Sequence, residues 1–361
     1  MMLDIKSQIC AAIDSSSRQS YDVGESHRSG HCPCSDARLD RYFQFCEAEL
    51  RETWGTGSGG IEIKELAILL SRMRADPDIT RETLSAKQPG DIELATRIAF
   101  MTSCLALDYS TDRLEKGGYR AEWRDTEPLS KFIEKFFEPQ SHMVLSYPEH
   151  LGHADFKSDL KATKLKKVLG IVIRPTNDIR DHLKLDRKNM TLDVFHCTGF
   201  VKEHLRRSKD PGDKRTIQDA LKRGALPRQL MLEVLESLQG VLFPLSDKKS
   251  RKMLASYVAN GAFDPDVQNF EFVSIKNKGE ETVPFYYLST RLSELHHELL
   301  NPKPRGWLER QFERRSGARY MMMATMIGVL FAVFLGFLSL ALSSYQTYIA
   351  YQAWQHPVSP D

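Results

Sequence analysis

The stretch that most constrains this chain lies near its C-terminus, where the 23 residues from Tyr320 to Leu342 carry no formal charge. A helix rises 1.5 Å per residue, so a helix of this length is about 34 Å long and could cross a bilayer core of about 30 Å. A buried core helix of a globular protein usually keeps a polar stripe, whereas the small polar residues here are Thr325 and Ser339. We therefore predict one transmembrane helix over residues 320–342.

Basic residues are distributed unevenly around this segment. Residues 303–319 contain six lysines and arginines against two glutamates, whereas residues 343–361 contain neither Lys nor Arg. An excess of basic residues stays on the cytosolic side of a membrane. We therefore expect a tail-anchored, single-pass protein with a large cytosolic N-terminal part and a short extracytosolic tail over 343–361. Which organelle's membrane it occupies does not follow from the sequence. The tail carries aromatic residues typical of a membrane interface: Tyr345, Tyr348, Tyr351 and Trp354.

The basic juxtamembrane segment, residues 303–319, mixes apolar and cationic side chains. Trp307, Leu308 and Phe312 fall roughly on one helical face with arginines around them. This pattern is typical of a short interfacial helix on an anionic leaflet, and a plain positively charged flank of the span accounts for it equally well. In the first case the residues at the membrane surface are Trp307, Arg310, Phe312, Arg314, Arg315 and Arg319.

Small residues recur at every fourth position of the apolar segment, at Ala324, Gly328, Ala332 and Gly336. Small side chains let two helix backbones approach closely, and packing drives helix association in lipid. We therefore expect a helix–helix contact here, with homo-association as one form of it. Chance is the competing explanation, because Gly and Ala are frequent in membrane helices.

The remaining chain has the composition of a globular protein, with 27% charged and 41% hydrophobic residues. A formal charge of +2 gives no overall attraction to nucleic acid, and six scattered cysteines suit a reducing compartment better than a disulfide framework. The first 20 residues lack an apolar run of signal-peptide length, so a cleaved secretory signal is not expected. Residues 1–37 are polar, rich in Ser and Gly, and predicted to be a disordered arm.

Periodicity predicts a mostly α fold with a small mixed α+β portion. Apolar residues recur at helical spacing through 38–145, which we expect to be a helical region. Residues 156–300 mix helical patterns with short alternating ones, predicting an α+β cytosolic domain. Its strands or hairpins are expected around 170–196, where "GIVIRPT" ends at a proline and "LKLDRKNMTLDVFH" alternates on both sides of a turn, and around 270–285, where "FEFVSI" lies.

Three histidines within 23 residues, His182, His196 and His204, are the strongest candidates for chemistry, with Asp178, Asp181, Asp186 and Asp193 nearby. Their spacing matches no metal-binding pattern, since a zinc pair on a helix is placed at i and i+4. "HCPC" lacks a second ligand pair, and "GTGSGG" lacks both the carboxylates of a calcium loop and the Lys of a phosphate loop. We therefore expect no metal and no cofactor, and favour a protein that is not an enzyme. A membrane-tethered enzyme or metal-binding protein that uses the 178–204 block stays the alternative.

Lysines and arginines gather within residues 157–188 and raise the possibility of nucleic-acid binding. Acidic residues among them dilute the positive field, so we expect a solvated face of mixed charge and no nucleic-acid partner. The partners we expect are the lipid bilayer and proteins of unspecified identity.

The block "RPTNDIRDHLKLD…LDVFHCTGFVKEHL", followed by "NPKPRGWLERQFERRSGARYMMMAT" and the span, resembles a group of uncharacterised fungal proteins with a single C-terminal transmembrane helix. The likeness covers residues 90–355 and leaves the N-terminal arm outside it. It implies an architecture and a membrane location, and no activity. The sequence as a whole thus indicates a cytosolic interaction or adaptor module held at a membrane.

Overall fold

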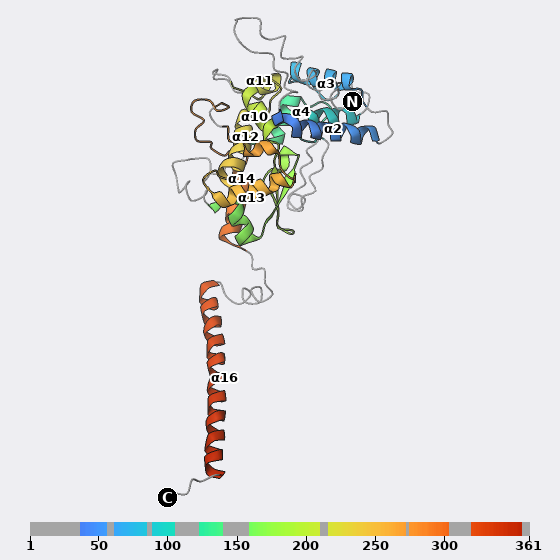
Figure 1. Ribbon diagram of the computed structural model, residues 1–361. Coiled ribbons are helices and arrows are strands. Elements are labelled where there is room, and N and C mark those ends of the chain that lie inside the picture. The colour runs from blue at the N-terminus through green and yellow to red at the C-terminus, as the bar shows by residue number, and fades with distance from the viewer. Residues whose placement is uncertain are drawn as a thin grey trace. The chain divides into compact units, whose positions relative to one another are not determined.

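The computed structural model divides the chain into two compact units, Met1–Asn301 and Pro302–Asp361 (Figure 1). The structure describes residues 37–55, 61–84, 89–104, 123–139, 159–209, 216–271, 274–302 and 319–355. The predicted disordered arm, 1–37, therefore lies almost wholly outside the described residues. We call the described part of the first unit, residues 37–301, the domain, and describe the second unit by itself.

The N-terminal part of the domain is helical, as the sequence predicts. It contains the 3-10 turn η2 (Ala37–Leu39) and the helices α2 (Asp40–Gly55), α3 (Ile63–Ala75), α4 (Pro89–Phe100) and α6 (Leu129–Phe136). In α2 the residues that recur at helical spacing, Tyr42, Phe43, Cys46 and Leu50, are all buried. The 3.6-residue period thus places one apolar face of this helix in the core.

Residues 159–302 add more helices and a small sheet. The helical elements are α9 (Ala162–Lys164), η3 (Leu165–Leu169), η4 (Ile179–Asp181), α10 (Thr198–Arg207), α11 (Ile217–Lys222), α12 (Arg228–Leu235), η5 (Glu236–Leu242), α13 (Lys248–Ala259), η6 (Pro265–Gln268) and α14 (Ser289–Leu300). The strands are β1 (Val172–Thr176), β2 (Lys184–Asp186) and β3 (Thr191–Phe195). The expected class, mostly α with a small α+β portion, is confirmed.

The sheet has the order β1-β3-β2, with β1 parallel and β2 antiparallel to the central strand β3. The β2–β3 pair is the predicted hairpin. β1 continues through Pro175, where the sequence suggested that it ends. The N–H of Val172 donates to the carbonyl of Met190 at 2.9 Å. Since alternate backbone N–H groups of a strand point to the same side, those of Val172 and Arg174 point toward β3 and the nitrogen of Pro175 points away from it. A proline at an outward position of an edge strand removes no hydrogen bond from the sheet.

The strand expected around 270–285 is not formed in the described residues of that segment, which are turns, bends and irregular chain. The reason is that backbone groups of this segment form hydrogen bonds with buried ionic side chains instead of with a strand. The carbonyl of Ile275 accepts from Arg228 Nη2 at 2.6 Å, and the N–H of Asn277 donates to Glu280 Oε2 at 2.8 Å. Ile275 and Asn277 therefore bond to an ion pair instead of to a neighbouring strand.

One continuous apolar core joins the helical N-terminal part to the α+β part. α10 is central to it, since it packs against α2, η2, α12 and η6. The approach of α10 to η2 depends on Gly199, where an added Cβ would lie 1.9 Å from the backbone oxygen of Arg38. Only a residue without a side chain allows these two segments to touch.

Candidate functional site

The second unit contains one long helix, α16 (Arg319–Gln355), drawn in red in Figure 1. Within its segment Thr325–Gln355, an 18-residue window reaches a mean hydropathy of 2.4, and all the side chains of the segment are exposed within the chain. The predicted membrane helix is therefore present as a helix long and apolar enough to cross a bilayer. It continues from Leu342 to Gln355, through most of the residues expected to form the tail.

The C-terminal third of α16 differs in chemistry from the rest. It exposes the aromatic residues expected there, with Tyr345 64% and Trp354 79% exposed. Glutamine amides one turn further on donate to tyrosine hydroxyls, from Gln352 to Tyr348 at 3.0 Å and from Gln355 to Tyr351 at 2.7 Å. Aromatic rings with polar tips favour the boundary between lipid and water. This end of the helix thus suits a membrane interface.

The predicted ridge of small residues lies on α16 and extends further than the sequence suggested. An added Cβ at Gly328 or Gly336 would meet nothing within 4 Å. A shallow groove along this helix is lined by Gly336, Ser339, Leu340, Ser343, Ser344 and Thr347. At about 100° per residue, Gly328, Ala332, Gly336, Ser339, Ser343 and Thr347 fall within an arc of about 100°. We call these six residues the small-residue face.

Three members of this face, Ser339, Ser343 and Thr347, lie outside the predicted ridge, because one i+3 step, from Gly336 to Ser339, interrupts the i, i+4 repeat. Ala324 belongs to α16, but its side chain lies outside the described residues, as does that of Arg319. The other proposed membrane-surface residues lie in 303–318, also outside the described residues: Trp307, Arg310, Phe312, Arg314 and Arg315.

The first histidine of the 178–204 block, His182, is completely buried. Its Nδ1 accepts the N–H of Phe195 at 3.0 Å, and its Nε2 lies 2.7 Å from the hydroxyl of Ser237. That hydroxyl lies 2.9 Å from the carbonyl of Val234, to which it donates, so the imidazole donates from Nε2. Burial lowers the pKa of His182 to about 3. This neutral ring uses both nitrogens to connect β3 with η5.

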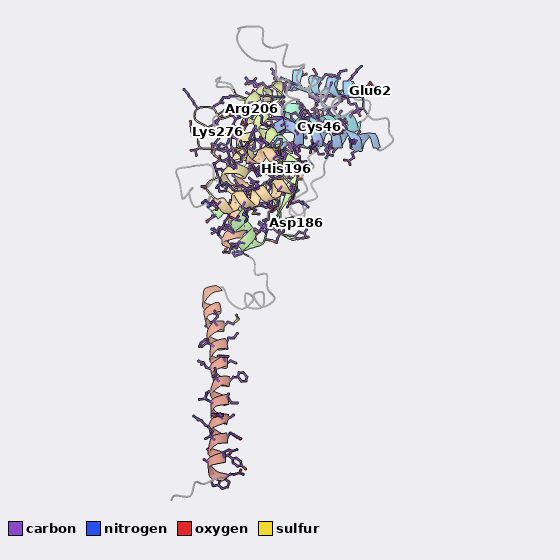
Figure 2. The ribbon with its side chains drawn as sticks, viewed as in Figure 1. Cys46, Glu62, Asp186, His196, Arg206 and Lys276 are labelled. Carbon is purple, nitrogen blue, oxygen red and sulfur yellow. The ribbon has the colours of Figure 1, made fainter. Side chains whose placement is uncertain are left out.

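The other two histidines hold backbone in the same way, at separate places. Nδ1 of His196 accepts the N–H of Asp264 at 3.1 Å, and Nδ1 of His204 accepts the N–H of Leu226 at 2.9 Å. Burial lowers the pKa of His196 to about 4 and that of His204 to about 3. Figure 2 shows His196 inside the body of the domain, where its ring stacks on Phe263. The three rings therefore do not form one ligand set.

The four aspartates of the block also have structural partners. Asp178 caps η4 and accepts from Thr102 at 2.9 Å, and Asp193 forms a two-point ion pair with Arg174 at 2.6 and 2.9 Å. Asp186, labelled in Figure 2, accepts the N–H groups of its own hairpin turn, and Asp181 pairs with a lysine of β2 at 3.3 Å. Within the described ranges, no group of three or more His, Cys, Asp or Glu is placed to hold a metal ion.

Buried charges elsewhere in the domain were not found from the sequence. The carboxylate of Glu233 accepts three consecutive backbone N–H groups, from Tyr286, Tyr287 and Leu288, at 2.8, 2.8 and 2.9 Å. These groups precede α14, so Glu233 on α12 fixes the start of that helix from a distance. Burial raises the pKa of Glu233 to about 7 against the opposing effect of these bonds.

Two buried ion pairs complete this internal framework. Lys202 is fully buried and donates to both Oδ2 and the carbonyl of Asp266 and to the carbonyl of Asn269, at 2.6, 3.1 and 2.7 Å. Arg228 pairs with Glu280 through two bonds of 2.8 and 2.6 Å. Each charge is balanced and its donors are used. These groups tie separate segments of the domain together.

No protein-family model matches this chain, and neither the curated proteins nor the solved structures contain a match. The function is therefore argued from α16 and from the geometry of the domain.

Proposed function

We propose that this chain is a tail-anchored membrane protein whose α-rich domain acts on the cytosolic side as an interaction module. The observation that carries the proposal is the exposed apolar surface of α16. Between Ile327 and Leu342 eleven Leu, Ile, Val and Phe side chains are exposed. Each favours insertion by about 0.3–0.6 kcal/mol, so together they supply about 3–7 kcal/mol. From Tyr320 to Gln355 no charged side chain opposes insertion.

Orientation is proposed from the charges that flank α16. Five basic residues precede it in 303–318, Arg319 is its first residue, and no Lys or Arg follows Leu342. At 1.5 Å per residue, the 37 residues of α16 measure about 55 Å, longer than a bilayer of about 40–45 Å with its headgroups. Tilt or projection of the aromatic end into the far interface accommodates the excess.

An interaction role is favoured over catalysis because the groups that could react are already engaged in the fold. Nδ1 of each of His182, His196 and His204 accepts a backbone N–H, and burial raises the pKa of the thiols of Cys104 and Cys197. A buried, protonated thiol is a poor nucleophile. The alternative, an enzyme or metal-binding protein built on residues 178–204, has no comparable support in the described residues.

We further propose that the small-residue face pairs α16 with another helix, a second copy of this chain being the simplest partner. Small residues permit close backbone approach, and the Ser339 and Ser343 hydroxyls are suited to bonds between helices. Ala332→Leu together with Gly336→Leu should weaken association. Ala341→Leu is the matched control, because Ala341 lies on the opposite side of the helix. A membrane two-hybrid signal that is equal for both variants would contradict the pairing.

Membrane anchoring itself is tested by alkaline carbonate extraction of cells that express the full chain or a chain ending at residue 318. The full chain should stay in the membrane pellet and the shortened chain should not. Proximity labelling from the domain would then identify its neighbours. An adaptor should label a reproducible set of proteins that disappears when α16 is removed.

A further inference from the structure

The domain carries a basic surface that the proposed function does not use. Two elements close in space supply exposed cations for which the described residues show no ion pair. We call this surface the basic face. It consists of Lys166 and Lys167 of η3 and Lys248, Lys249, Arg251 and Lys252 of α13.

α9, which runs directly into η3, meets α13 at the hydroxyls of Thr163 and Ser250, which are 3.3 Å apart. Lys166 and Lys167 are three and four residues from Thr163, a distance of about 6 Å along a helix. The four cations of α13 lie within two residues of Ser250 on either side. All six charges therefore surround one joint. The carboxylate beside it, Asp247, is occupied as the cap of α13 and accepts the N–H and hydroxyl of Ser250 at 3.2 and 2.6 Å.

Apolar side chains are exposed beside these cations. Leu245 precedes the cap of α13 and is 52% exposed, and Val168 follows the lysines of η3 and is 39% exposed. A surface that combines lysines with isolated apolar side chains is typical of binding to an anionic membrane, because the lysines attract the headgroups and the apolar groups enter the interface.

The last described helix of the domain, α14 (Figure 1), packs against η3, which carries Lys166 and Lys167. The last residue of α14, Leu300, is 62% exposed. Residues 301–318 separate it from α16. A linker of this length spans at most about 60–65 Å. Such a tether holds the domain at a high effective concentration near the bilayer, so a weak electrostatic attraction suffices for binding.

We propose that the basic face docks the domain on the anionic lipid headgroups of the membrane that holds α16. This inference rests on the proposed anchoring. An acidic protein or a nucleic acid would match the same charges, and the contact of η3 with α14, the last described helix before the membrane segment in sequence, favours lipid over both.

The test uses the full chain reconstituted into vesicles of phosphatidylcholine alone or with added phosphatidylserine. A fluorophore on an unnatural amino acid at Ser246, an exposed position between Leu245 and α13, reports energy transfer to acceptors in the headgroups. Transfer should increase with phosphatidylserine and fall at high salt. The variant K248E/K249E/K252E should lose this increase, because each lysine changes binding to an anionic leaflet about fivefold and three change it by about a hundredfold.

The matched control is K64E/K131E/K222E, which reverses three exposed lysines on α3, α6 and α11. These helices contact one another and lie apart from the joint of α9 and α13 in the pattern of element contacts. The control should keep the response to phosphatidylserine. An equal loss in both variants would show a general charge effect and overturn the proposal. So would a response that is absent in the unchanged protein, or binding of a DNA duplex or polyglutamate to the face at the expense of phosphatidylserine.

Failure of docking is distinguishable from failure of anchoring. If α16 does not insert, the protein does not co-float with either kind of vesicle, and the proposed function itself is wrong. If the protein co-floats with both vesicles and Ser246 reports no difference between them, anchoring stands and docking is refuted.

Discussion

Replacing His182 distinguishes a structural from a functional role for the 178–204 block. His182→Ala removes the acceptor for the buried N–H of Phe195 and the donor to Ser237. An unsatisfied buried donor costs about 1–3 kcal/mol, and the space left by the ring adds to that loss. We expect the free energy of unfolding to fall by about 3–5 kcal/mol, at the large end for a single substitution.

Two comparison variants sharpen this prediction. His182→Asn keeps an acceptor near the position of Nδ1 and should recover part of the loss. His297→Ala makes the same change at an exposed position and should alter stability by less than about 0.5 kcal/mol. The measurement is guanidinium unfolding of the full chain in mild detergent, followed by near-ultraviolet circular dichroism. The structural reading is refuted if His182→Ala unfolds at the unchanged midpoint while a stoichiometric metal ion or a turnover is lost.

Further predictions concern the core and its titration. Gly199→Ala should destabilise the domain by about 1–3 kcal/mol or more, because its Cβ would overlap a backbone carbonyl. Thermal unfolding would measure this loss as a lower midpoint temperature. Lys202→Met should cost about 3–5 kcal/mol by leaving Asp266 buried without its cation; a loss below about 1 kcal/mol would contradict the buried pair. The histidine contribution to stability should also fall on acidification below about pH 6. The three buried histidines have lowered pKa values, so the unfolded chain binds their protons first. Buried carboxylates with raised pKa values oppose this by binding protons first in the folded state: Glu49, Asp178, Glu233 and Asp264. His182→Asn removes one of the three histidines, so between about pH 6 and pH 4.5 its stability should fall less steeply than that of the unchanged chain, by about 1.4 kcal/mol per pH unit in unfolding titrations at successive pH values.

Periodicity predicted the local structure well where packing follows the chain's own pattern. The buried stripe of α2, the hairpin of β2 and β3 and the apolar run of α16 each have a period or a length that only one kind of element satisfies. The strand expected from "FEFVSI" was not formed in its described residues, because the backbone of Ile275 and Asn277 bonds to the side chains of Arg228 and Glu280. These two ionic residues are 52 positions apart in sequence. Local pattern carries no information about such a pair.

The candidate site shows the same division. The small-residue face was partly predicted, since its positions follow from the geometry of one helix. The role of the histidines was not, because their partners come from elsewhere in the fold: Ser237 for His182 and the N–H of Asp264 for His196. Spacing alone could reject a metal motif, but it could not show that each imidazole ring accepts a backbone N–H from another segment of the fold. Glu233 carried no signal in sequence, because its three partners lie over 50 residues away.

The central claim is that α16 crosses a membrane with the domain on the cytosolic side. An N-glycosylation acceptor appended after Asp361 tests both parts, because glycosylation occurs in the lumen of the secretory pathway. In a microsomal insertion assay the full chain should acquire a glycan at this acceptor, while an acceptor inserted in the domain next to exposed Ser246 stays unmodified. Glycosylation of the domain acceptor alone would contradict the orientation, and an unmodified chain that is fully extracted by alkaline carbonate would contradict the anchor.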